Sequence, residues 1–174
     1  AAKNSNVAAC VSILADDIGK LPIHTFNNQK KDIGMKHPVA KLLYERPNPF
    51  MSAFVFKQTI QGHIGIYGNG IAYIKWGPDG YPVALWPLDP VRTFVQLDAA
   101  KGTLHYRTQN AQGEVYDLKP DEVLHFKAFT RDGIIGIPPW KTLIDELDSQ
   151  NALKSFICDF YHNSTLSSGI LKTA

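Results

Sequence analysis

The first third of the chain places apolar residues three or four positions apart. From Asn6 to Leu21 this spacing predicts a helix with one buried face, because an α-helix makes one turn every 3.6 residues. Either Ser5 or Asn6 can serve as its N-cap, and Pro22 follows its end. The N-terminal segment is therefore predicted to pack against the rest of the protein through one side.

Two further helices are predicted before residue 67. The first lies around Val39 to Tyr44 and ends before Pro47 and Pro49, because a residue that precedes proline disfavours helical backbone angles. Ser52 is a good N-cap for the second helix, whose apolar side chains share one face. The residues of that face are Ala53, Phe56, Ile60, Ile64 and Tyr67.

After Gly70 the pattern changes to short β-rich segments separated by turn residues. The turns are Pro78-Asp79-Gly80, Lys101-Gly102 and Gln112-Gly113, at spacings typical of hairpins. We predict an antiparallel meander of five or six strands over residues 71–129. Alternation along two of the strands gives each an apolar and a polar face: Leu104 and Tyr106 oppose His105 and Arg107, and Leu124, Phe126 and Ala128 oppose His125 and Lys127.

Residues 139–163 are predicted to form a long helix that begins at Pro139, because proline suits the first helical turn. Its apolar residues fall into two stripes, separated by the polar run 148–151. The predicted fold class is α+β, with helices packed around an antiparallel β-meander. We expect a single domain over residues 1–174, with a helical part at 1–67, the meander at 71–129 and the long helix at 139–163.

The composition is that of a globular protein. Of 174 residues, 44% are hydrophobic and 20% are charged. A balance of 18 Lys and Arg against 16 Asp and Glu leaves a net charge of +2, too small to bind nucleic acid by overall charge. No apolar run is long enough to suggest a membrane span, so no membrane partner is expected. Cys10 and Cys158 are interpreted as free thiols, although a disulfide between them stays open.

The segment Gly68-Asn69-Gly70 invites comparison with a phosphate-binding loop. Such a loop needs a strand before it and a helix after it, because the amides at a helix N-terminus bind the anion. Here the predicted helix comes first and the strand second. We therefore interpret Gly68 or Asn69 as a left-handed residue that ends the helix, not as part of an anion site.

Catalytic and metal-binding patterns are not found in the sequence. The six histidines are scattered without the spacing of a metal site, and the acidic pairs consist of adjacent residues whose side chains diverge. The G-x-S-x-G motif of serine hydrolases is also missing. We therefore expect no cofactor, no metal and no enzyme activity; a hydrolase would need a cleft in which carboxylates converge.

Four residues could contact an anion or an acidic partner. His105, Arg107, His125 and Lys127 are predicted to line one outward face of two nearby strands. A solvated sheet face explains them more simply. The alternative is a small nucleic-acid-binding module that uses this face, which would bind DNA with a steep dependence on salt concentration.

Several motifs occur in one order along most of the chain. They are HPVAKLLYERPNP, GNGIAYIKW, VALWPLDPVRTFV and EVLHFKAFTRDGIIGIPPW, followed by a long helix and SSGIL. Together they resemble the portal proteins of tailed bacteriophages, which are the head-to-tail connector subunits. The positions that the resemblance marks as structural are Pro47, Asn48, Pro49, Gly68, Asn69, Gly70, Asp132, Gly133, Gly136 and Pro139.

This resemblance implies a structural subunit without catalytic residues. Portal subunits form a ring, commonly of twelve, at one capsid vertex; double-stranded DNA passes through its channel. Terminase, capsid or scaffold protein, and tail or adaptor proteins are the implied partners. The implied location is the virion, with assembly in the cytoplasm of the bacterial host of a phage or prophage. The chain resembles only the N-terminal, wing-type part of a subunit, so the regions that contact most of the DNA are expected beyond Ala174.

Overall fold

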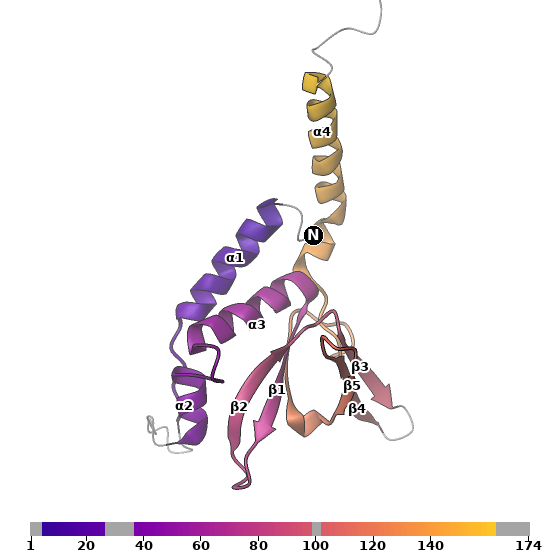
Figure 1. Cartoon of the computed structure of the whole chain (residues 1–174). Coiled ribbons are helices and arrows are strands. Elements are labelled where there is room, and N and C mark those ends of the chain that lie inside the picture. The colour runs from indigo at the N-terminus through magenta and orange to yellow at the C-terminus, as the bar shows by residue number, and fades with distance from the viewer. Residues whose placement is uncertain (1–4, 27–36, 99–101, 163–174) are drawn as a thin grey trace, which may run out of the picture. The chain divides into compact units, whose positions relative to one another are not determined.

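The computed structural model describes residues 5–26, 37–98 and 102–162. Its helices and strands are α1 Ser5–Lys20, α2 Pro38–Tyr44, α3 Ala53–Tyr67, β1 Asn69–Trp76, β2 Pro82–Leu88, β3 Thr93–Asp98, β4 Thr103–Gln109, β5 Val115–Leu118, β6 Val123–Lys127 and α4 Ile144–His162 (Figure 1). Short 3₁₀ helices lie at Pro120–Glu122 and Pro139–Leu143. The chain divides into two compact units, Ala1–Trp140 and Lys141–Ala174.

The six strands of the first unit form two antiparallel sheets of three strands each. Their orders are β2-β1-β6 and β3-β4-β5. In the first sheet Ile74 lies opposite Leu85 of β2, while Ile71 lies opposite His125 of β6. The α+β class and the antiparallel strands are confirmed. The arrangement as one continuous meander is wrong, because β6 returns to pair with β1.

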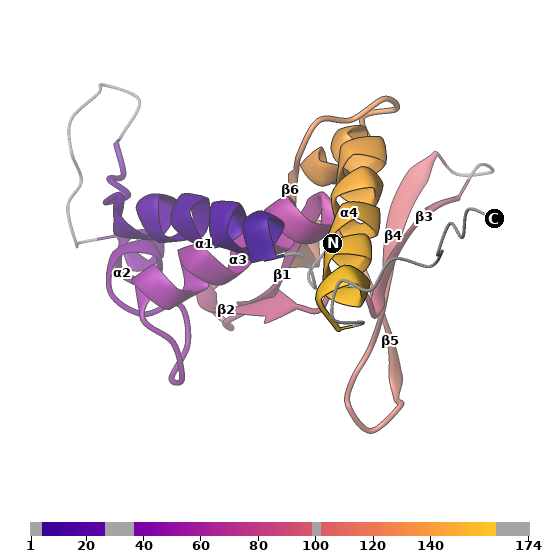
Figure 2. The same ribbon diagram turned by 90° about the horizontal axis from the view of Figure 1, so that it is seen from above.

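Both faces of β1 are buried, which explains why it takes the central position in its sheet. On one face, Ala72 and Ile74 pack with Phe56 and Ile60 of α3 and with Leu85. A second cluster, Ile71, Tyr106 and Val123, fills the space between the two sheets. The first unit is thus layered, with α3 on one face of sheet β2-β1-β6 and sheet β3-β4-β5 on the other (Figures 1 and 2).

Helix α1 packs along α3 on the side away from the sheet (Figure 2). Glycine allows this close approach at two points. A Cβ atom at Gly65 would lie 3.1 Å from the Val11 methyl groups, and one at Gly19 would lie 2.8 Å from the Phe54 ring. The helix predicted for the N-terminal segment is confirmed, but Ser5 and Asn6 both belong to it, so neither is its N-cap. Its buried residues are Ala15 and Gly19, whereas Leu14 and Ile18 of the apolar pattern are exposed.

Both predicted ends of α3 are confirmed. The Ser52 hydroxyl accepts a hydrogen bond from the Val55 amide at 3.3 Å, as an N-cap does. At the other end Gly68 has φ +78°, and its amide donates to the Ile64 carbonyl. Gly70 then brings β1 close to α3, since a Cβ there would lie 2.8 Å from Ile60 Cγ2.

The second unit contains α4. The sequence predicted an α-helix from Pro139, but residues Pro139–Leu143 form a 3₁₀ turn and the α-helix begins at Ile144. The polar run 148–151 lies within α4 and does not interrupt it. The predicted end at residue 163 and the SSGIL motif lie outside the described residues. Within the described ranges, the helices are too short or too polar to cross a membrane.

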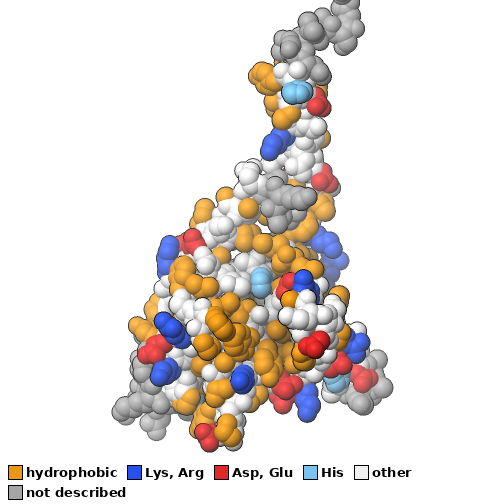
Figure 3. All heavy atoms as spheres, in the orientation of Figure 1, with side chains coloured by type: hydrophobic (Ala, Val, Ile, Leu, Met, Phe, Trp, Pro, Cys, Tyr) orange, Lys and Arg blue, Asp and Glu red, His pale blue; other side chains and the backbone are white. Residues whose placement is uncertain are grey.

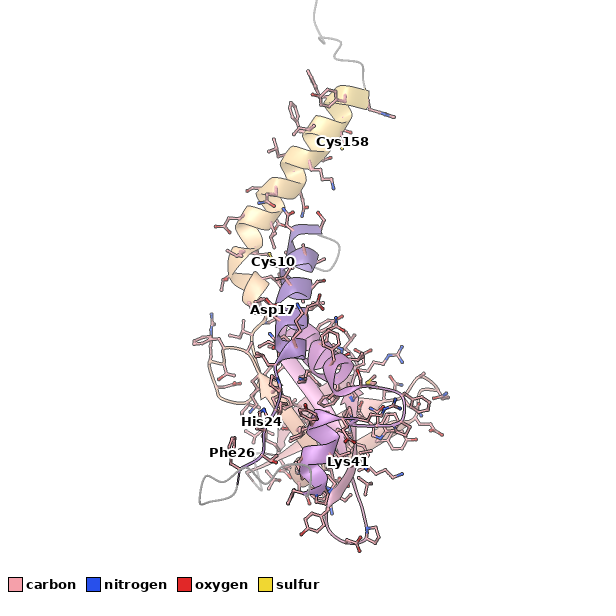
Figure 4. The ribbon with its side chains drawn as sticks, turned by 90° about the vertical axis from the view of Figure 1, so that its left-hand side faces the viewer. Cys10, Asp17, His24, Phe26, Lys41 and Cys158 are labelled. Carbon is pink, nitrogen blue, oxygen red and sulfur yellow. The ribbon has the colours of Figure 1, made fainter. Side chains whose placement is uncertain are left out.

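The surface of the first unit carries hydrophobic side chains interspersed with charged ones (Figure 3). Exposed examples include Phe50, Val83 and Phe129. Cys10 lies on α1 and Cys158 on α4, and both thiols are free and exposed (Figure 4). The two cysteines belong to different units.

Candidate functional site

The Asn69 side chain connects three parts of the first unit. Its Nδ2 donates hydrogen bonds to the carbonyls of Tyr67 at 3.1 Å and Gly136 at 3.0 Å. Its Oδ1 accepts from the Gly136 amide at 2.8 Å and lies 3.0 Å from Nε2 of His125. One amide side chain therefore joins the end of α3 to β6 and to the segment that follows β6. We call Gly68, Asn69, His125 and Gly136 the Asn69 junction.

These contacts determine the tautomer of His125. Because Asn69 Oδ1 is an acceptor, Nε2 of His125 carries the proton and donates it. Nδ1 is then the acceptor for the Tyr106 hydroxyl, 3.2 Å away. Burial, with a smaller effect of the nearby Lys127 charge, lowers the pKa of His125 to about 4. The imidazole is therefore neutral at neutral pH and links the two sheets through Tyr106 of β4.

The segment between β6 and Pro139 is an ordered turn. Asp132 Oδ1 accepts from the amides of Ile134 at 2.8 Å and Ile135 at 3.1 Å, and these bonds lower the pKa of Asp132. Gly133 has φ +73°, a conformation that favours glycine. Its carbonyl accepts a hydrogen bond from Lys127 Nζ at 2.7 Å. These contacts explain why the sequence reads Asp-Gly at this point.

Gly136 lies against the end of α3 with no room for a side chain. A Cβ atom on Gly136 would lie 1.9 Å from the Gly68 carbonyl oxygen, which itself accepts a hydrogen bond from the Ala128 amide at 2.8 Å. Further along, Trp140 Nε1 donates to the Ile66 carbonyl at 2.7 Å. The GNG and DGIIGIPPW motifs, far apart in sequence, therefore form one structural junction.

A second anchor is formed by Pro47-Asn48-Pro49. Asn48 is 4% exposed, and its Nδ2 donates to the Leu85 carbonyl at 2.8 Å. Its Oδ1 accepts from the amides of Phe50 and Met51, each at 3.0 Å. Because the Leu85 amide also donates to the Pro47 carbonyl at 2.8 Å, this segment satisfies polar groups on the edge of β2.

The four residues predicted to share an outward face are divided between the two sheets. His105 and Arg107 lie on β4, whereas His125 and Lys127 lie on β6. The prediction is also wrong about the direction of His125, which lies half-buried against Tyr106. Alternation along a strand gives its two faces but not the sheet to which the strand belongs. A contact of these residues with an anion or partner stays a prediction.

Arg107 has a partner of its own. Its Nε and Nη2 donate to the two carboxylate oxygens of Asp117 on β5, at 2.8 Å and 3.3 Å. The pairing raises the pKa of Arg107 and lowers that of Asp117. Since this pair neutralises the arginine charge locally, the face of β4 offers less positive charge than the sequence alone implies.

The chemistry available at the Asn69 junction is hydrogen bonding. Its amide, imidazole and backbone groups are partnered by other groups of the first unit. In the residues that the structure describes, no three His, Cys, Asp or Glu side chains gather closely enough to hold a metal ion. The sequence pattern identified Asn69 only as part of a helix stop and missed its contacts with His125 and Gly136, because these two residues lie more than fifty positions away.

The comparison with protein families gives a match over residues 5–174 to the family described as "Phage portal protein". The chain belongs to the phage portal protein family. The portal protein of Enterobacteria phage HK97 is 28% identical over 173 residues, which cover 97% of this chain and 40% of that protein. An uncharacterised protein of Rickettsia bellii is 27% identical over 132 residues, covering 73% of this chain and 33% of its own length.

Solved structures share the fold of this chain. A chain in the neck of an empty gene transfer agent particle, computed with C6 symmetry, has a TM-score of 0.80 at 22% identity and covers 99% of this chain. A chain in the native neck, computed with C12 symmetry, has a TM-score of 0.73 at 22% identity and covers 95%. The match spans 45% and 46% of those two chains, so this sequence corresponds to less than half of each relative.

Proposed function

We propose that this chain is the wing-type part of a portal subunit that forms a ring at one vertex of a phage capsid. The observation that carries the proposal is the family match over residues 5–174, which runs through both units. The fold, with a TM-score of 0.80 to a particle-neck chain, supports the same assignment. The complete subunit would be more than twice as long, in keeping with the 40% of the HK97 portal protein that this chain covers.

The ring is proposed to contain twelve subunits and to form the channel for double-stranded DNA during packaging and ejection. The symmetries of the two gene transfer agent necks, C6 and C12, support a ring of this kind. Terminase, capsid or scaffold protein, and tail or adaptor proteins are the proposed partners. With a net charge of only +2, this part of the subunit is proposed to leave most DNA contacts to other regions.

The role proposed for the Asn69 junction and the Asn48 anchor is to hold the wing in one rigid arrangement. Their polar groups are directed at one another and at backbone atoms of the same unit. A group partnered in this way is not positioned to attack a substrate. We therefore propose a structural role without catalysis, in the virion and, before that, in the bacterial cytoplasm where particles assemble.

The experiment that tests this function is deletion of the gene in the phage or prophage that encodes the chain. Without the subunit, we expect particles that hold no nuclease-protected DNA. Supplying the wild-type gene from a plasmid should restore nuclease-protected DNA in the particles. A surface variant such as Asn151→Ala should restore packaging equally well, since Asn151 is exposed on α4. Normal DNA content without the gene would contradict the proposal.

A further inference from the structure

An apolar groove opens on the first unit where the end of α1, α2, α3 and β6 come together. Its volume is about 370 Å³. Its apolar lining is Ile18, Leu21, Pro22, Ile23, Leu43, Phe56, Ile60, Ile64, Leu124 and Phe126. Three of these side chains, Ile18, Leu21 and Phe126, are more than 40% exposed. Exposed apolar surface of this kind is costly in water and commonly marks an interaction site.

The C-terminal half of α4 has an apolar face of its own. Leu153, Phe156, Ile157 and Phe160 follow the spacing i, i+3, i+4 and i+7, which places them along one side of the helix. The rings of Phe156 and Phe160 stack with their centres 6.3 Å apart. At about 100° per residue, Ser155 and Cys158 lie on the opposite side. A helix with one such face gains most of its stability by burying it.

We infer that this face of α4 from one subunit docks into the apolar groove of a neighbouring subunit in the ring. The inference rests on the proposed ring. Two different apolar surfaces on one chain make a head-to-tail contact, which is the kind of interface that closes into a ring. Docking of an amphipathic helix into an apolar groove through anchors at i, i+3, i+4 and i+7 is a recurring mode of recognition.

Charge at the edge of the two surfaces favours the same pairing. Lys57 is a charged side chain in the groove lining, and its Nζ donates to the Leu21 carbonyl at the groove wall. On α4, Asp159 lies beside Phe156 at the border of the apolar face. An approach of Asp159 to Lys57 would place opposite charges at the rim of the contact and so help to orient the helix.

Cysteine crosslinking in the complete subunit tests the contact. The test pair combines Ile157→Cys, on the apolar face, with Gln61→Cys, in the groove lining, in a background that carries Cys10→Ser and Cys158→Ser. The control pair keeps the native Cys158, on the opposite side of the helix, with Gln61→Cys and Cys10→Ser. A short bis-maleimide is added to assembled rings, and products are separated under denaturing conditions.

The expected result is a ladder of covalent dimers and larger oligomers from the test pair and its loss in the control pair. Rings that assemble but give no ladder would overturn the docking and leave the proposed function standing. A crosslink that alters only the mobility of the monomer, or ladders of equal strength in both pairs, would also overturn it. If particle mass shows that no ring forms, the proposed function and this inference fail together.

Discussion

Asn69 and Gly136 exchange two hydrogen bonds, one from the Asn69 amide to the Gly136 carbonyl at 3.0 Å and one in return at 2.8 Å. The pair fastens the end of α3 to the segment after β6, across 67 positions of sequence. The Asn69 side-chain amide bonds to both the backbone carbonyl and the backbone amide of Gly136, as a residue on a neighbouring β-strand would. The junction is therefore expected to be a main source of stability in the first unit.

Asn69→Ala should lower the free energy of unfolding of the first unit by about 2–4 kcal/mol, because several part-buried groups lose a partner. Urea unfolding followed by tryptophan fluorescence measures this unit, since Trp76, Trp86 and Trp140 all belong to it. The control is Asn151→Ala on α4, which should leave the midpoint unchanged. Equal midpoints for Asn69→Ala and wild type would show that the junction contributes no stability.

Two glycines in one turn provide a matched test of crowding. Gly133→Ala should cost about 1–2 kcal/mol, because its φ of +73° is unfavourable for alanine although its surroundings are open. Gly136→Ala should cost about 3 kcal/mol or more, because its Cβ would lie 1.9 Å from the Gly68 carbonyl oxygen. Thermal unfolding of both variants measures the two losses of stability. A larger loss at Gly133 would mean that Gly136 does not lie against α3 as described.

The Asn48 anchor can be compared with a less buried asparagine whose side chain makes as many hydrogen bonds. The buried Asn48 side chain makes three, and the half-buried Asn110 side chain makes three in the turn between β4 and β5. We expect Asn48→Ala to lower the free energy of unfolding by about 2–3 kcal/mol and Asn110→Ala by about 1 kcal/mol or less. If urea unfolding gives the same loss of free energy for both variants, burial does not increase the contribution of the Asn48 hydrogen bonds to stability.

The pH dependence of stability follows from His125. Its pKa is about 4 when folded, against an ordinary value of 6.5, so between these values the unfolded chain binds more protons. Stability should therefore be fully present above pH 6.5 and decrease as the pH falls toward 4. His63 acts in the same direction, since burial lowers its pKa too. For the half-buried His125, the expected loss from pH 7 to pH 5 is about 1 kcal/mol.

The variant His125→Gln separates the contribution of His125 to the pH dependence of stability from the contributions of other groups. Glutamine keeps a donor for Asn69 and an acceptor for Tyr106 but does not titrate. Urea midpoints at pH 7 and pH 5 should differ less in His125→Gln than in wild type, with the remaining difference assigned to His63. If the two proteins lose the same stability over this range, His125 does not titrate as described.

Local features of the fold could be read from the sequence because neighbouring residues determine them. Ser52 caps α3 through an amide three positions away, and Gly68 ends the helix through its own backbone angle. The pairing of β6 with β1 could not be read in this way. Hairpin turns predict which neighbours pair, whereas the position of β6 depends on burying both faces of β1, a property of the assembled unit.

In the candidate site, too, local features could be predicted from the sequence but long-range contacts could not. Among the glycines of the portal motifs, Gly68 and Gly133 have positive φ, and Gly70 and Gly136 allow a close approach to other elements. The role of Asn69 lies in its side-chain partners, which the fold brings from other elements. The direction of His125 was wrong for a related reason: one face of β6 meets the second sheet, and a pattern of alternation does not distinguish that face from solvent.

The proposed ring is tested most directly by the particle mass of the complete subunit that contains this chain. Mass photometry of the purified protein, at concentrations where the subunit is folded, should show one dominant species with the mass of about twelve subunits. The 174-residue chain alone is expected to be a monomer or a weak oligomer, because a ring needs contacts over a large surface and this chain covers only 40% of the HK97 portal protein. A complete subunit that remains a stable monomer at all concentrations would contradict the account.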